Sequence, residues 1–223
     1  MAAVGVVALQ GDFEAHARLL RELGAKVREV RRCAHLGGLN GLVLPGGEST
    51  TLLKLMEDEP WFDEIRRFHG AGGAIFGTCA GAILLAREVR NPSQKSLGVL
   101  DAVVERNSYG RQVDSFATTV HSPALLGEIP AVFIRAPRFS DLGREVQVLA
   151  AREGEPVLVR QGRILAGTFH PELTGDPRVH RYFLSVVAES ERRAIDLVAP
   201  MNLAARRRTN ASGAAARQGE TSC

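Results

Sequence analysis

Cys79 stands in a sequence pattern that can turn a thiol into a nucleophile. It is the central residue of Gly77-Thr78-Cys79-Ala80-Gly81, the cysteine form of the G-x-S-x-G elbow, between a buried apolar run and a helical stretch. The sharp turn strains the central residue, so small residues two positions to either side avoid a collision. The sulfur then lies at a helix N-terminus, which favours the thiolate, and the Ala80 N–H is expected to point toward a developing oxyanion. A buried structural cysteine in a tight turn is the alternative.

A histidine and a carboxylate follow the last predicted strand, in the segment Phe169-His170-Pro171-Glu172. In an extended segment, residues two apart point to the same side, and Pro171 favours that backbone. Glu172 is therefore expected to approach His170 and fix its tautomer, so that the other ring nitrogen faces the thiol. Taken alone, the tripeptide fits an ordinary turn better. Beside a cysteine elbow, it supplies the base and the orienting group that a nucleophile needs.

The turn at 45–50, with the sequence PGGEST, is a further candidate part of the site. Its two glycines allow backbone amides to approach a ligand closely, so we expect it to complete an oxyanion hole or to hold a substrate carboxylate. A phosphate-binding loop is a competing interpretation, but the Walker lysine is absent. A plain strand-to-helix turn is the third interpretation.

The remaining histidines and cysteines are assigned no role. Three cysteines are too few and too scattered for a disulfide framework, and no C-x-x-C pair suggests zinc. We therefore expect neither a metal site nor a cofactor. The residues left without a role are His16, His35, His69, His121, His180, Cys33 and Cys223.

Three distant segments must meet for this chemistry, and the elements between them predict how. Apolar strand-like runs at 4–9, 26–31, 41–44 and 74–78 alternate with predicted helices after Asp12, from the 45–50 turn to Met56, at 61–69 and at 80–89. Asp12 is placed to cap the first of these helices. Strand, helix and strand with short connections predict an α/β fold with a doubly wound sheet and right-handed crossovers.

The region from 97 to 169 differs, because its β-forming residues are broken by turns at short intervals. Antiparallel strands are predicted at 99–106, 116–120, 132–135, 146–151, 156–160 and 164–169. A final helix is predicted at 176–188. The expected fold is thus a parallel sheet with an antiparallel extension.

Composition places this fold in one domain followed by a basic tail. The 223 residues are 45% hydrophobic, with no run of about 18 apolar residues that could span a membrane. The N-terminus lacks the pattern of a signal peptide, so we expect a cytoplasmic protein. Residues 190–223 carry six arginines against three acidic residues, and the whole chain is +3, so residues 1–189 are neutral overall. The sequence predicts a domain at 1–189 and a mostly disordered tail at 190–223.

With these residues in place, the chain resembles the class I (triad) glutamine amidotransferases. More narrowly, it is similar to the glutaminase subunits of pyridoxal 5′-phosphate synthases over about residues 4–187. The elbow and the His-Pro-Glu tripeptide are shared by the whole class, and the LPGGEST and GTFHPEL segments also carry the similarity. The segments QGDFEAH, RNSYGRQ and FIRAP are typical of the narrower group.

The resemblance implies a three-layer, flavodoxin-like architecture and a specific reaction. L-Glutamine would be hydrolysed to L-glutamate and ammonia through a glutamyl thioester on Cys79. Ammonia would pass to a (β/α)8-barrel synthase subunit that makes pyridoxal 5′-phosphate, or vitamin B6, from ribose 5-phosphate and glyceraldehyde 3-phosphate. No nucleic-acid or membrane partner is implied.

The resemblance also implies individual roles. Cys79 is the nucleophile, His170 the base and acid, and Glu172 its orienting group. Gly47 and Ala80 supply the oxyanion hole. Gln10 faces the synthase partner. The residues implied to contact glutamine are Gly47, Glu48, Ser49, Arg106, Ile134 and Arg135.

Three other functions compete with this one. The chain could serve as the glutaminase of another pathway, such as histidine, purine or aminobenzoate synthesis, but the RNSYGRQ segment argues against that. It could be a catalytically silent binding subunit, against which the intact Cys79, His170 and Glu172 argue. A cysteine peptidase or esterase built on the same elbow is the third.

Overall fold

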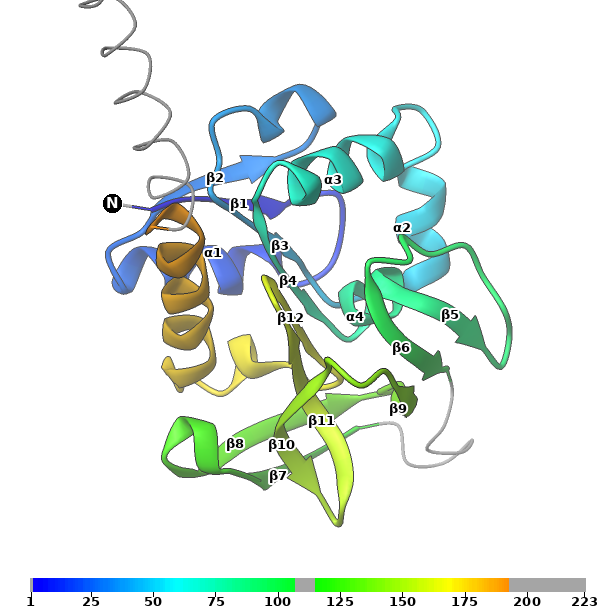
Figure 1. The fold of residues 1–223 in the computed structure, drawn as a ribbon, viewed down its shortest axis with the longest axis vertical. Helices are drawn as coiled ribbons and strands as arrows, with labels where there is room; N and C mark the ends of the chain where they lie inside the picture. The colour runs from blue at the N-terminus through cyan, green and yellow to red at the C-terminus, as the bar shows by residue number, and fades with distance from the viewer. Residues whose placement is uncertain (1, 107–114, 193–223) are drawn as a thin grey trace, which may run out of the picture.

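The computed structural model describes residues 2–106 and 115–192 (Figure 1). Residues 107–114, which include most of the RNSYGRQ segment, lie outside the described residues. The predicted tail at 190–223 also lies outside them, apart from residues 190–192, which continue a helix. Within the described part of the chain, no helix is long and apolar enough to cross a membrane.

One half of the main sheet is parallel and carries the site. Its strands run in the order β2-β1-β3-β4-β12, which is the order of a flavodoxin-like doubly wound sheet. The first four match their predicted positions closely. The last, predicted to be antiparallel, does pair antiparallel with β11, but it also pairs in parallel with β4. The bounds are β1 Ala3–Val7, β2 Lys26–Val30, β3 Gly41–Leu44, β4 Ala74–Thr78 and β12 Ile164–Gly167.

The other half of the same sheet is antiparallel, as predicted. It continues from β12 in the order β11-β10-β7-β8, and its hairpins need only short turns. The strand β8 ends beside the pocket described below. The bounds are β7 Ser115–Ser122, β8 Gly127–Ile134, β10 Gln147–Arg152 and β11 Glu155–Gln161.

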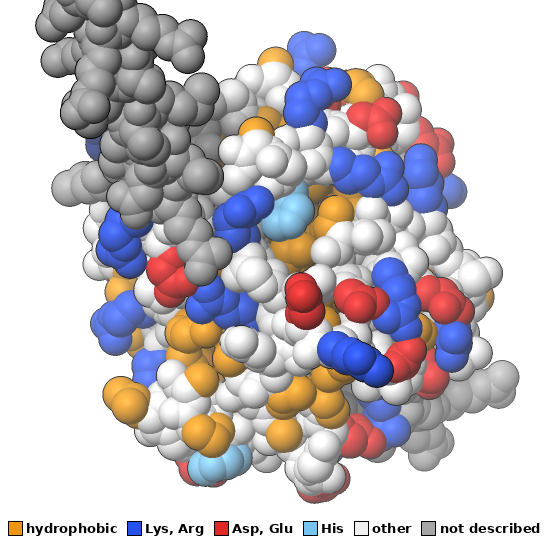
Figure 2. All heavy atoms as spheres, in the orientation of Figure 1, with side chains coloured by type: hydrophobic (Ala, Val, Ile, Leu, Met, Phe, Trp, Pro, Cys, Tyr) orange, Lys and Arg blue, Asp and Glu red, His pale blue; other side chains and the backbone are white. Residues whose placement is uncertain are grey.

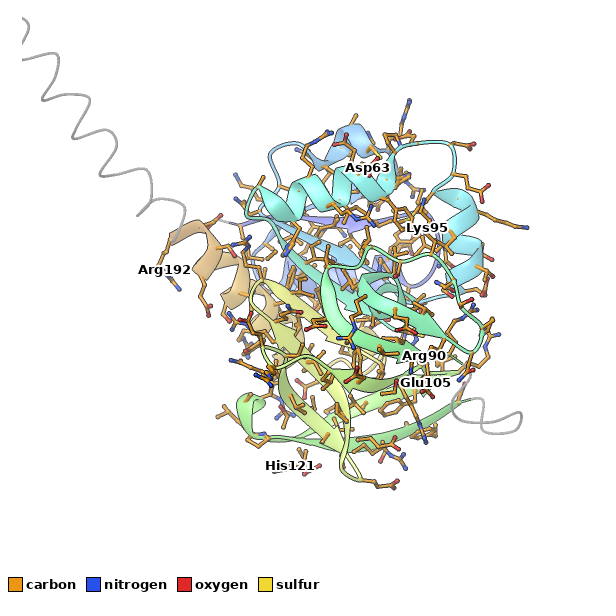
Figure 3. The ribbon with its side chains drawn as sticks, turned by 45° about the vertical axis from the view of Figure 1, so that its right-hand side comes forward. Asp63, Arg90, Lys95, Glu105, His121 and Arg192 are labelled. Carbon is orange, nitrogen blue, oxygen red and sulfur yellow. The ribbon has the colours of Figure 1, made fainter. Side chains whose placement is uncertain are left out.

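A second, small sheet was not predicted as such. It has the order β5-β6-β9, with β5 at Ala86–Arg90, β6 at Leu100–Glu105 and β9 at Arg138–Leu142. The helix predicted at 80–89 is therefore wrong in its second half, because the chain turns extended at Ala86 and pairs with β6. Pairing between distant segments overrides local helix propensity here. Figure 3 shows Arg90 and Glu105, which are register partners on β5 and β6.

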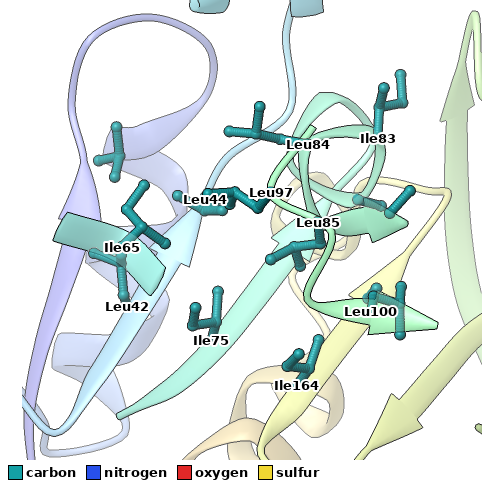
Figure 4. Close-up of a cluster of buried hydrophobic side chains, with 14 of the residues drawn as sticks. Leu42, Leu44, Ile65, Ile75, Ile83, Leu84, Leu85, Leu97, Leu100 and Ile164 are labelled. Atoms are coloured by element: carbon teal, nitrogen blue, oxygen red, sulfur yellow. The ribbon is translucent and has the colours of Figure 1, made fainter. Parts of the chain in front are cut away.

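Helices cover both faces of the parallel half, which makes three layers. Alternate residues of each strand point to opposite faces, so Leu42 and Leu44 pack on one side and Val43 on the other. The first face is covered by α2, α3 and α4, and the close-up in Figure 4 shows its leucines and isoleucines. The second face is covered by α1 and the C-terminal helix. The helices are α1 Phe13–Glu22, α2 Ser49–Leu55, α3 Trp61–Gly70, α4 Ala80–Leu85 and residues 178–192.

Most of the charged side chains that the structure describes lie on the outside of these layers, and Glu172 is a buried exception. On the face shown in Figure 2, basic and acidic side chains are interspersed. Many of them pair locally, such as Arg90 with Glu88 at 2.6 Å and Arg32 with Glu59 at 2.9 Å. Exposed pairs of this kind contribute little to stability, so the fold depends on the two apolar cores.

Candidate active site

Cys79 lies in a strained turn between β4 and α4. Its backbone has φ 46° and ψ −104°, a conformation that L-residues rarely adopt, and its side chain is only 5% exposed. The two glycines are required by packing: a Cβ on Gly77 would lie 2.7 Å from the Gly81 backbone, and one on Gly81 would lie 1.9 Å from the Leu44 carbonyl oxygen. The elbow geometry predicted from the sequence is confirmed.

His170 and Glu172 form a buried pair beside the elbow. The His170 Nδ1 and the Glu172 Oε1 are 2.7 Å apart, and both side chains are almost completely buried. The expected extended backbone is wrong, because Pro171–Leu173 forms a short 3-10 helix with His170 at its N-cap. Proline is well suited to the first position of such a turn. The turn, rather than an extended chain, brings the carboxylate back to the ring.

Electrostatics within this group favour a charged histidine and a charged carboxylate. Burial opposes the imidazolium, but interaction with Cys79 and Glu172 outweighs it and raises the pKa of His170 to about 10. Burial also opposes ionisation of Glu172, but His16 and His170 hold its pKa well below the usual range. Because the two partners stabilise each other's charged forms, the pair is arranged as an ion pair next to the thiol.

The 45–50 turn lies against the histidine. A Cβ on Gly46 would come 2.3 Å from the His170 Cε1, so only glycine fits between the turn and the ring. Gly47 has φ +132°, and its Cβ would lie 2.5 Å from the Gln10 Oε1. The same Gln10 oxygen accepts a hydrogen bond from the Glu48 backbone N–H at 3.2 Å. Gln10 thus lies directly under the turn.

One pocket brings the predicted site residues together. Cys79 and His170 both line it, and the Cys79 Sγ lies 3.8 Å from the Ile134 carbonyl oxygen. Arg135, the next residue, has a left-handed φ of 43°, a second strained position at the pocket wall. The six residues implied to bind substrate all line the pocket, together with Ile83 and Pro137: Gly47, Glu48, Ser49, Arg106, Ile134 and Arg135.

The carboxylate of Glu48 is occupied by the helix that it begins. It accepts hydrogen bonds from the backbone N–H groups of Thr50 and Thr51 and caps α2. The hydrogen bond from the Thr50 hydroxyl has the largest effect on the pKa of Glu48. Burial raises that pKa, but the hydrogen bonds outweigh burial and lower it to about 2. Arg106 Nη2 lies 3.6 Å from Glu48 Oε1, so an acidic and a basic group face each other at the pocket mouth.

Several polar residues around the pocket were not predicted. Gln94 accepts a hydrogen bond from the Ser49 hydroxyl at 2.8 Å, and His16 and His180 are fully buried behind Glu172. These residues come from segments far apart in the chain, so no spacing rule marks them. Only the placement of His16 on the apolar face of α1, where a histidine needs a polar partner, was a usable signal.

Asp12 occupies the N-cap position of α1 but makes no side-chain capping bond, so the predicted cap is wrong. Its carboxylate instead points toward the triad, with Oδ2 3.9 Å from the His170 Nδ1. Ligand atoms of Asp12, His170 and Glu172 lie close enough to hold a metal ion. An ion bound to Nδ1 would have to displace the Glu172 hydrogen bond, so metal binding would compete with the pairing of His170 and Glu172.

The fold and this site define a family. A model of the SNO glutamine amidotransferase family matches residues 6–189, and the chain belongs to that family. A pyridoxal 5′-phosphate synthase subunit PdxT of Koribacter versatilis is 55% identical over 184 residues, which cover 82% of this chain and 95% of the relative. The subunit of the same name from Deinococcus radiodurans is 52% identical over 191 residues, covering 83% and 97%. The resemblance stated from the sequence is confirmed.

Solved structures agree with the fold. A crystal structure of a glutamine amidotransferase is 54% identical, with a TM-score of 0.78, and the match covers 83% of this chain and 98% of that one. A putative GMP synthase protein from Thermoplasma acidophilum is 21% identical, with a TM-score of 0.64, over 87% and 98% of the two chains. The second likeness shows the shared fold alone.

Proposed function

We propose that this chain is the glutaminase subunit of a pyridoxal 5′-phosphate synthase. The observation that carries the proposal is the buried His170–Glu172 pair, 2.7 Å apart, whose His170 lines one pocket with the strained Cys79. The identity of 55% to a PdxT subunit supports glutamine as the substrate and vitamin B6 synthesis as the destination of its nitrogen.

The first half of the reaction forms a thioester. The Cys79 thiolate adds to the side-chain amide carbon of glutamine, and the amide oxygen becomes an oxyanion. Backbone N–H groups of Gly47 and Ala80 stabilise that charge, and one such donor contributes about 3–4 kcal/mol. The imidazolium of His170 then gives its proton to the departing nitrogen, the C–N bond breaks, and ammonia leaves.

The second half returns the enzyme to its starting state. Once the sulfur is acylated, it carries no negative charge, so one of the interactions that raise the pKa of His170 disappears. The neutral imidazole can then take a proton from water, which attacks the thioester carbon. The C–S bond breaks, glutamate leaves, and the thiolate–imidazolium pair forms again. Glu172 keeps the ring oriented through both steps.

The pocket residues fit an amino acid substrate. Arg106 and Arg135 offer positive charge to the α-carboxylate of glutamine, and Glu48 with Ser49 offers acceptors for its ammonium group. The resulting ammonia would be protonated in water and lose its nucleophilicity. A synthase subunit that docks over the Gln10 side and receives the ammonia directly avoids that loss. We place the reaction in the cytoplasm and the catalytic domain at 1–189.

The decisive experiment compares two nitrogen sources. This chain is mixed with the synthase subunit, ribose 5-phosphate and glyceraldehyde 3-phosphate, and pyridoxal 5′-phosphate is measured with glutamine or with an ammonium salt. Wild type should support both reactions, whereas Cys79→Ala should support only the ammonium reaction. A variant that still uses glutamine would exclude the nucleophile, and glutamate release without any pyridoxal 5′-phosphate would exclude the pathway.

A further inference from the structure

Two histidines outside the proposed triad lie buried behind it. His16 on α1 and His180 on the C-terminal helix are both 0% exposed, and their Nδ1 and Nε2 atoms are 2.9 Å apart. Both rings pack edge-on against Phe76, with centroids 5.9 and 5.8 Å away. Burying two imidazoles is costly unless their nitrogens find partners, so the arrangement needs an explanation.

The second nitrogen of His16 reaches the proposed active site. His16 Nε2 lies 3.3 Å from Glu172 Oε2 and 3.2 Å from the Thr78 hydroxyl, and Thr78 precedes Cys79. Glu172 Oε2 is buried, and no described residue gives it a well-aligned hydrogen bond. The 3.3 Å contact is therefore electrostatic and not a well-aligned hydrogen bond. It still makes His16 the group that faces Glu172 Oε2, as His170 faces Oε1.

The proton positions in this group follow from the hydrogen-bond partners. Burial lowers the pKa of His180 to about 3, so His180 is neutral and carries one N–H. Among the described residues, its Nδ1 has no hydrogen-bond partner, and a buried unpaired N–H is rarer than an unpaired acceptor. The proton therefore belongs on Nε2, which donates to His16 Nδ1. His16 then carries its proton on Nε2, directed at Thr78 and Glu172.

We propose that His16, oriented by His180, is a positioning residue that holds the Glu172 carboxylate in the geometry required by His170. The chain of contacts then runs from Cys79 through His170, Glu172 and His16 to His180. It joins Cys79 to α1 and the C-terminal helix, which cover the second face of the main sheet. The inference rests on the proposed glutaminase function and adds a residue that does not touch the pocket, since His16 is not among its lining residues.

The charged groups around these contacts support a role for His16 in holding the Glu172 carboxylate in place. Glu172 faces His170 and His16, and His170 faces Cys79, Glu172 and, at 3.9 Å, Asp12. Burial of Glu172 raises its pKa, but the Nε2–H of His16, 3.3 Å from Oε2, attracts the carboxylate and acts in the opposite direction. Without that attraction, the carboxylate would be freer to rotate away from His170.

Two conservative substitutions separate this role from mere packing. In His16→Gln, the amide group reaches about as far as Nε2 and can still contact Glu172. In His16→Asn, the amide reaches only as far as Nδ1 and can contact His180 but not Glu172. Both carry the same uncharged amide group, so they form a matched pair, and the lower helix propensity of Asn is controlled for by the thermal unfolding of each variant.

The assay measures kcat and KM for glutamate release by the complex with the synthase subunit. His16→Asn should lose about 10–100-fold in kcat with KM unchanged, by analogy with the loss on removing the hydrogen-bond partner that orients a metal ligand. His16→Gln should recover much of that loss. Equal kcat for the two variants, or a change confined to KM, would overturn the proposal. Wild type with no glutamate release would instead refute the proposed function.

A double-mutant cycle tests whether His16 acts through Glu172. In a Glu172→Gln background, His16→Asn should cost little further activity, because the group it positions is already removed. If the fold-losses in activity of the two substitutions multiply in the double variant, His16 acts independently of Glu172, and the proposal is overturned. Thermal unfolding of each variant checks that the comparison is made between folded proteins.

Discussion

Cys79 and His170 face the same pocket, but the protein holds them in different ways. Cys79 is held by backbone packing, since Gly77 and Gly81 allow three main-chain segments to approach without side chains between them. His170 is held by polar contacts, through Glu172 and the buried histidines behind it. The comparison teaches that a nucleophile on an elbow needs a fixed backbone, whereas the proton carrier needs a fixed ring and a fixed charge.

The largest loss of activity is expected from removing the polar contacts that hold His170, which we call the polar side of the site. Glu172→Gln keeps the size of the side chain but removes the charge that supports the imidazolium. We expect kcat for glutamate release to fall by about 10⁴-fold, the size of loss found when the orienting carboxylate of a serine protease triad is changed. Steady-state kinetics of the complex with the synthase subunit measures it, with Glu128→Gln as a control at an exposed carboxylate beside His121. A loss under tenfold would mean that Glu172 does not orient His170.

Disrupting the backbone packing around Cys79, which we call the packing side of the site, should lower stability as well as activity. In Gly81→Ala, the new methyl group would lie 1.9 Å from the Leu44 carbonyl oxygen, which belongs to the backbone and cannot move aside easily. We expect the free energy of unfolding to fall by about 1–3 kcal/mol or more. Urea unfolding measures this.

Gly70→Ala is the matched control, because nothing lies within 4 Å of a Cβ at that helical position. It should leave stability unchanged or raise it by up to about 1 kcal/mol. Similar destabilisation by both substitutions would contradict the account of the elbow.

The polar side should also make stability depend on pH. The folded-state pKa of His170 is about 10, above the value of about 6.5 for an unfolded histidine. The imidazolium therefore contributes stability that is fully present below pH ~6.5 and is lost as the pH rises toward 10. The difference in unfolding free energy between wild type and His170→Gln should shrink across that window. Urea unfolding at a series of pH values tests it, and a constant difference would contradict it.

The smallest effect is expected from a change that touches neither the polar contacts of His170 nor the backbone packing around Cys79. Removing residues 193–223 should leave kcat, KM and thermal stability close to those of the full chain, because the family match ends at residue 189 and the sequence predicts a mostly disordered tail. The same assays measure it with the synthase subunit present. A large loss of activity would show that these residues contribute to the complex.

The sequence predicted the packing side of the site better than the polar side. The elbow is a local pattern, so Gly77, Cys79 and Gly81 could be placed from their spacing alone. The parallel strands could be predicted for the same reason, because each is a short apolar run between turns.

What could not be predicted depends on contacts between distant segments. The strand β5 exists because residues 86–90 pair with β6, and no local propensity indicates it. His16 and His180 meet across 164 positions of the chain. The approach of Glu172 to His170 was predicted for the wrong reason, since a turn and not an extended backbone produces it.

The most direct test of the central claim is to detect the acyl-enzyme on Cys79. The complex with the synthase subunit is mixed with glutamine and quenched in acid, and the digested protein is analysed by mass spectrometry. The account predicts a glutamyl group bound through sulfur to the peptide that contains Cys79, removable by hydroxylamine and absent from Cys79→Ala. Steady glutamate release with no such adduct, or with an adduct on another residue, would contradict it.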